Sequence, residues 1–71
     1  MQALYFFDTL QQARDYRYQH GTGGWIFAPD ASDTAQRYPM TQCIIFPPDM
    51  TPSHIFHHPA TKGRSGRLIG N

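Results

Sequence analysis

Residues 3–28 read ALYFFDTLQQARDYRYQHGTGGWIFA, and this stretch decides the fold. The aromatic density of residues 3–7 is typical of a β-strand. Neither proline nor glycine interrupts residues 9–20, which we predict to form a helix. After a run of glycines, the apolar residues 25–28 predict a second strand. A strand, a helix and a strand in this order indicate a sheet with a helix packed against it.

The predicted helix has recognisable ends. Asp8 is a suitable N-cap, and Gln11 follows it at the spacing of a capping box. Gly21 is the expected stop, because glycine readily takes the left-handed conformation that ends a helix. At 100° per residue, one side of the helix carries Leu10, Ala13, Tyr16, Arg17 and His20.

The rest of the chain alternates short apolar runs with turn residues. Residues 29–41 read as a long polar loop, and residues 42–46 predict a third strand. A short helix is expected at residues 52–58, with Thr51 as its N-cap and a proline in its first position. Residues 67–69 are suited to an edge strand or a docking tail. The fold class is therefore α+β: a small two-layer domain in β-α-β-β-α order, with about three strands and one main helix packed on one face.

A chain of 71 residues forms a single domain. We expect a compact part over residues 1–59 and a basic C-terminal arm or edge strand over residues 60–71. The first helix covers one face of the sheet and leaves Tyr5 and Phe7 on the other. The second helix and the tail, or a partner, must cover that face. A domain of this size buries little surface, so a homodimer is an open alternative.

The overall composition indicates a globular cytoplasmic protein. Apolar residues make up 39% of the chain and charged residues only 15%, which is low for a folded domain. No run is long and apolar enough to span a bilayer, and no signal peptide is recognisable. Cys43 is the only cysteine, which excludes an internal disulfide and suits a reducing compartment.

The sequence argues against an enzyme, a metal site and a cofactor. Cys43 lies in a predicted buried strand, where a thiol is usually inert packing. His54 and His58 are the only weak metal candidates, since they would share a helix face if residues 52–58 were helical. Structural zinc sites need four ligands, however, and the chain has no CxxC pair. The glycines at 21–24 follow a helix instead of preceding one, so they do not form a phosphate loop.

Cations and aromatic residues are the better candidates for function. Lys62, Arg64 and Arg67 lie in a segment rich in glycine and serine, which could follow a phosphate backbone or meet acidic groups on a protein. Arginine and tyrosine interleave elsewhere, a pattern suited to interface anchors and to base stacking. The predicted partner-binding residues are Tyr16, Arg17, Tyr18, Trp25, Arg37, Lys62, Arg64 and Arg67.

Three stretches resemble small accessory proteins encoded by phages and prophages. They read GGWIF at residues 23–27, IIFPPDMTPSHIF at 44–56 and HPATKGRSGR at 58–67. The resemblance implies a protein that binds host machinery, a class that includes inhibitors of bacterial defence systems such as CRISPR complexes. It identifies no functional residue.

These observations favour a small non-enzymatic inhibitor or modulator that binds a bacterial host or defence complex and acts sterically. One alternative is a nucleic-acid-binding accessory protein that uses the basic C-terminal arm. The other is a homo-oligomeric structural or metal-binding module.

Overall fold

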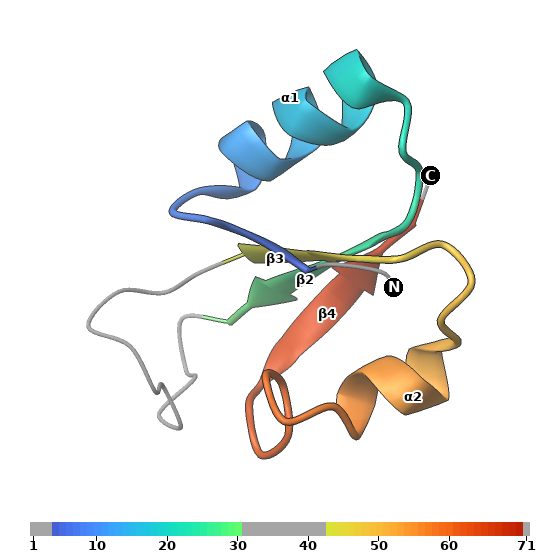
Figure 1. Cartoon of the computed structure of the whole chain (residues 1–71). Coiled ribbons are helices and arrows are strands. Elements are labelled where there is room, and N and C mark those ends of the chain that lie inside the picture. Colours follow the sequence, from blue (N-terminus) through green and yellow to red (C-terminus); the bar gives the residue numbers. More distant parts are fainter. Residues whose placement is uncertain (1–3, 31–42, 71) are drawn as a thin grey trace.

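The computed structural model describes residues 4–30 and 43–70 of the chain. They form four strands and two helices, and the predicted α+β class is confirmed with one strand more than expected (Figure 1). The elements are β1 (Tyr5–Phe7), α1 (Leu10–His20), β2 (Trp25–Pro29), β3 (Cys43–Phe46), α2 (Pro52–Phe56) and β4 (Gly66–Ile69). Residues 31–42, most of the predicted polar loop, lie outside the described residues.

The four strands form one antiparallel sheet in the order β1-β3-β2-β4. Both β1 and β2 run antiparallel to β3, so they are parallel to each other with β3 between them. In the same way, β3 and β4 are parallel with β2 between them. The first two strands are therefore not neighbours.

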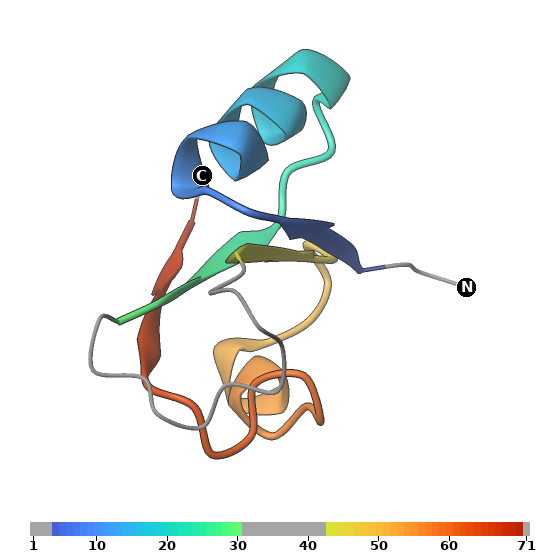
Figure 2. The same ribbon diagram turned by 90° about the vertical axis from the view of Figure 1, so that its left-hand side faces the viewer.

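This topology places the two helices on opposite faces. The crossovers from β1 to β2 and from β3 to β4 step across the sheet in the same sense, but they start from strands of opposite direction. If both have the usual right hand, their helices must lie on opposite sides of the sheet. α1 and α2 are arranged in this way (Figures 1 and 2). The second helix thus covers the face that the first helix leaves open.

Each helix covers a separate apolar cluster. On the α1 side, the buried members are Ala13, Ile26, Ala28, Cys43 and Ile45. On the α2 side, they are Phe27, Ile44, Phe46 and Ile55. Contrary to the predicted faces, Phe7 packs on the α1 side, where Tyr5 and Phe7 both contact the ring of Tyr16. The reason is that α1 folds directly back over β1, so the odd-numbered residues of that strand face the helix that follows.

The ends of α1 are close to the predicted positions. The N-cap is Thr9, whose hydroxyl accepts a hydrogen bond from the backbone N–H of Gln12 at 3.1 Å. The amide oxygen of Gln12 accepts in return from the backbone N–H of Thr9 and of Asp8. The capping box is therefore one residue later than the Asp8 and Gln11 pair that we predicted. Gly21 ends the helix in the left-handed conformation, as expected.

The segment between α2 and β4 is folded into a compact turn. Thr61 is fully buried, and its hydroxyl donates to the carbonyl oxygen of Ile55. The backbone N–H of Asp30 donates to the carbonyl oxygen of Ser65 at 2.9 Å, which extends the pairing of β2 with β4 by one residue. β4 therefore begins from a fixed position and forms one edge of the sheet.

Gly24 is expected to be essential for the entry into β2. Its φ is +96°, and a Cβ atom there would lie against the carbonyl oxygen of Phe46. We expect Gly24→Ala to lower the free energy of unfolding by at least about 2 kcal/mol, measured by urea denaturation. Gly21→Ala is the control, since Gly21 also has a positive φ but open space around it. Gly21→Ala should lower the free energy of unfolding by only about 1 kcal/mol. Equal losses at the two sites would contradict the close approach of Gly24 to the carbonyl oxygen of Phe46.

Candidate functional site

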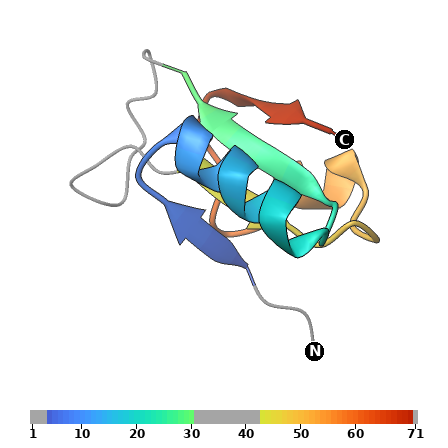
Figure 3. The ribbon, with the colours of Figure 1, turned by 90° about the horizontal axis from the view of Figure 1, so that it is seen from above.

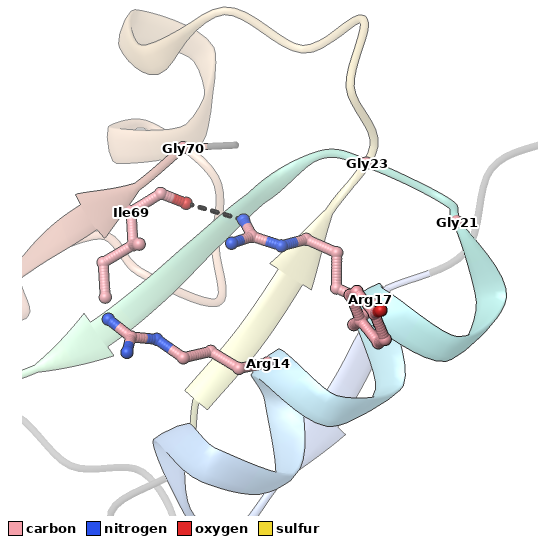
Figure 4. A pocket seen from close by; sticks show the side chains of 7 residues that line it. Arg14, Arg17, Gly21, Gly23, Ile69 and Gly70 are labelled. Carbon is pink, nitrogen blue, oxygen red and sulfur yellow. Dashed lines mark hydrogen bonds between the residues drawn. The ribbon is translucent and has the colours of Figure 1, made fainter.

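An open groove of about 680 Å³ lies between α1 and the C-terminal end of β4. It arises because α1 packs on β1, β3 and β2, so that β4 extends beyond the helix (Figure 3). The lining residues are Arg14, Arg17, Tyr18, Gly21, Gly23, Ile69 and Gly70. We call this hollow the α1–β4 groove. Two arginines thus line it, and their guanidinium groups extend toward Ile69 (Figure 4).

Arg17 holds the groove together. Its Nη1 donates to the carbonyl oxygens of Gly24 and Ile69, each at 3.0 Å. These bonds join α1 to the start of β2 and to the end of β4. The Nε and Nη2 groups of Arg17 have no acceptor within residues 4–30 and 43–70. Arg17 therefore has a structural role and still presents unused donors to the groove.

Arg14 was missed by the sequence analysis. It lies three residues before Arg17, a spacing that places both side chains on neighbouring positions of one helix face. Arg14 is exposed, and its guanidinium has no partner among the described residues. The sequence could have predicted this pair, because the predicted helix over residues 9–20 already places Arg14 and Arg17 at neighbouring positions of one face.

Arg67 extends the basic surface along β4. Side chains two apart on a strand point to the same face, so Arg67 shares the α1 face with Ile69. It pairs across the sheet with Ala28, which also belongs to the cluster under α1. We refer to Arg14, Arg17 and Arg67 as the arginine strip. The arginine strip lies along the α1 side of β4, which is one of the two edge strands.

The other predicted cations lie elsewhere. The guanidinium of Arg64 lies 5.4 Å from the centre of the Phe27 ring, which belongs to the α2 side of the core. Its Nη1 also donates to the carbonyl oxygen of Ala60. Lys62 is exposed in the turn before β4. Arg37 lies outside the described residues. Arg64 and Arg67 are close in sequence but therefore lie on opposite sides of the sheet.

The predicted aromatic anchors differ in their exposure. Tyr18 is 89% exposed and borders the α1–β4 groove. Trp25 is partly buried in the α2-side cluster. Tyr16 packs against Phe7 and stacks on His20, with ring centres 5.3 and 4.1 Å apart. Desolvation and a hydrogen bond with Tyr5 raise the pKa of Tyr16 above its ordinary value. Of these three aromatic residues, Tyr18 alone offers its whole ring to a partner.

His54 and His58 do not lie on one helix, which was the condition for their binding a common metal ion. α2 ends at Phe56, so His54 and His58 do not share a helix face. His54 is exposed, whereas His58 packs edge-on against Phe46 and accepts a hydrogen bond from the backbone N–H of Ala60. Within the described parts of the chain, no three histidine, cysteine or acidic residues form a group that could hold a metal ion.

Cys43 is buried at the start of β3. Desolvation raises the pKa of its thiol, and the nearby positive charge of Arg64 offsets only part of that rise. The thiol is therefore less ionised at a given pH than a free cysteine would be. Since the thiolate is the reactive species, this environment is suited to packing and not to nucleophilic chemistry.

Comparison of the chain with protein-family models, with curated proteins and with solved structures finds no match. Among the described residues, neither helix has the length and apolar character needed to cross a membrane.

Substitutions of Arg14 and Arg17 should separate structure from surface charge. Arg17→Ala removes a donor from two partly buried carbonyl groups, so we expect it to lower the free energy of unfolding by about 1–3 kcal/mol. Arg14→Ala removes the same charge from an exposed position and should change the free energy of unfolding by less than about 0.5 kcal/mol. Urea titrations of both variants measure the difference. If the two losses were equal, the bonds to Gly24 and Ile69 would not be stabilising.

The Cys43 thiol should react slowly in the native protein. Burial limits access, and the raised pKa reduces the thiolate fraction at pH 8, so both effects act in the same direction. We expect an aromatic disulfide reagent to modify the native thiol on the order of 100-fold more slowly than the urea-unfolded one. Similar rates in both states would show that β3 is accessible to solvent.

Proposed function

We propose that this protein is a small non-enzymatic binding module that modulates a bacterial host or defence complex by occupying its surface. The supporting observation is the α1–β4 groove, where the exposed Tyr18 lies beside the donors of Arg14 and Arg17. Tyrosine and arginine are among the residue types that are enriched at the energetic centres of protein interfaces. The proposed setting is the bacterial cytoplasm, and the resemblance to phage accessory proteins agrees with this role.

The side chains favour binding over catalysis. A nucleophile requires an adjacent base and a third group that orients that base. The thiol of Cys43 is buried with a raised pKa, and the ring nitrogens of His57 and His58 contact backbone groups of their own turn. The groove offers arginines and a tyrosine, which recognise and orient a partner.

A protein partner suits the surface better than a nucleic acid. The nucleic-acid alternative relied on the basic C-terminal arm over residues 60–71. Residues 60–65 are a hydrogen-bonded turn and Gly66–Ile69 form a strand. Arg64 and Arg67 lie on opposite sides of the sheet. The net charge of +1 is also small for a surface that must follow a phosphate backbone.

The proposal predicts that partner capture depends on the α1–β4 groove. A tagged chain is used to capture proteins from bacterial lysate, with and without nuclease, and the affinity for the captured protein is then measured. We expect Tyr18→Ala to weaken binding by about 30-fold, the loss typical of a central interface anchor. Arg14→Ala should weaken it less.

Lys62→Ala is the matched control, because it removes one exposed positive charge outside the groove. It should leave binding unchanged within about twofold. Capture that disappears with nuclease would favour nucleic-acid binding instead. Capture that is insensitive to Tyr18 and to Arg14 would show that another surface meets the partner.

A further inference from the structure

The outer edge of β4 has backbone groups open for pairing. Along antiparallel strands, residue pairs that are hydrogen-bonded alternate with pairs that are not. The hydrogen bond from the backbone N–H of Asp30 to the carbonyl oxygen of Ser65 therefore shows which pairs of β2 and β4 are hydrogen-bonded. The pairs of Arg67 with Ala28 and of Ile69 with Ile26 are then hydrogen-bonded. The pair of Gly66 with Pro29 is not, which agrees with the missing N–H of proline. The N–H and C=O groups of Gly66 and Leu68 therefore point away from the sheet.

No strand among residues 4–30 and 43–70 pairs with this edge. An exposed edge is usually protected by a charged side chain, and Arg67 alone would fit that ordinary explanation. The edge of β4 has more than one charge, however. Arg14 and the unused donors of Arg17 lie on the same side, so three like charges follow one open strand. Such a field repels a basic strand and attracts an acidic one.

We infer that the partner binds through an extended acidic segment that joins β4 as a fifth strand. This inference rests on the proposed function and names the element that the groove receives. Main-chain hydrogen bonds to Gly66 and Leu68 would supply register, as in other cases of strand addition to a sheet edge. Carboxylates on the α1 side would meet the arginine strip, where planar guanidinium groups can bind them in a bidentate manner.

The two faces of β4 also specify the alternation in that segment. Arg67 and Ile69 lie on the α1 face, whereas Leu68 packs with the α2-side cluster. Successive side chains of an added strand point to opposite faces. Every second residue should therefore be acidic, and the residues between them should be apolar and lie beside Leu68.

Neither a second copy of this chain nor a nucleic acid meets these requirements. The chain has no Glu, and its five Asp are at positions 8, 15, 30, 33 and 49, none of them two residues apart. A phosphate backbone could pair with the arginines, but its phosphates carry no N–H groups for the edge carbonyls of Gly66 and Leu68. A polypeptide provides both kinds of contact.

The test uses a capped, fluorescein-labelled eight-residue peptide in which glutamate alternates with valine. Fluorescence anisotropy measures its affinity for the full chain, and NMR hydrogen exchange follows individual amides. We expect saturating peptide to slow exchange at Gly66 and Leu68 by at least about tenfold. Arg14→Ala and Arg67→Ala should each weaken binding by about threefold, and added salt should weaken it further. Lys62→Ala is again the control and should have little effect.

Three further probes can overturn the inference. A peptide of the same sequence with an N-methyl group on every backbone nitrogen should fail to bind, because it has no N–H group to pair with the edge. A peptide with lysine in place of glutamate should also fail. Equal binding of either peptide, or an equal loss of affinity in Lys62→Ala and Arg67→Ala, would refute strand addition. Tighter binding of a thymidine oligonucleotide at the same residues would identify a nucleic-acid site.

The outcomes separate this inference from the proposed function. If a captured protein depends on Tyr18 but the acidic peptide does not bind, the groove binds protein without strand addition, and only the inference fails. If capture does not depend on the groove and the peptide does not bind, both fail. If the protein alone sediments as a larger species while Gly66 and Leu68 are already protected, a second copy occupies the edge and the inference is wrong.

Discussion

The structure depends on the burial of β3 on both of its faces. All four residues from Cys43 to Phe46 are buried, and neighbouring residues of a strand point to opposite sides. A single helix cannot cover such a strand. The chain therefore needs an apolar layer above and below the sheet, and α1 and α2 provide them. The order of the strands follows, since two crossovers of the same hand reach opposite faces only when β4 lies beyond β2.

This requirement also decides where a function can be located. In a chain of 71 residues, both faces of the central strands are used for the core, and no deep internal site remains among the described residues. The surfaces left are the edges of the sheet and the margins of the helices. α1 packs on β1, β3 and β2 and leaves β4 to its side, and the groove between α1 and β4 is lined by Arg14, Arg17 and the exposed Tyr18. The candidate site is thus a consequence of the position of α1 over β1, β3 and β2.

Local signals were sufficient for α1 but not for the C-terminal segment. The helix was predictable because capping residues, an uninterrupted interior and Gly21 all indicate the same limits. The one-residue error at its start arose because Asp8 and Thr9 are both good caps. β4 has weaker local signals, because its start depends on a contact between residues that are far apart in the sequence. A Cβ atom at Gly66 would lie 2.6 Å from the Phe27 ring, so glycine is needed there for a reason that the local sequence does not show. The separation of Arg64 from Arg67 likewise depends on strand pairing, which no sequence pattern specifies.

Binding of the proposed partner at the arginine strip would be coupled to folding. Arg17 and Arg67 are 50 positions apart in the chain, and only the folded sheet brings them to one surface. An anionic partner that contacts both residues therefore binds the folded state alone and stabilises it by mass action. Arg17 strengthens this coupling, since the same guanidinium that lines the groove also donates to Ile69 at the end of β4. A small domain has little stability in reserve, so a partner at this edge would hold β4 in place as well as being bound by it.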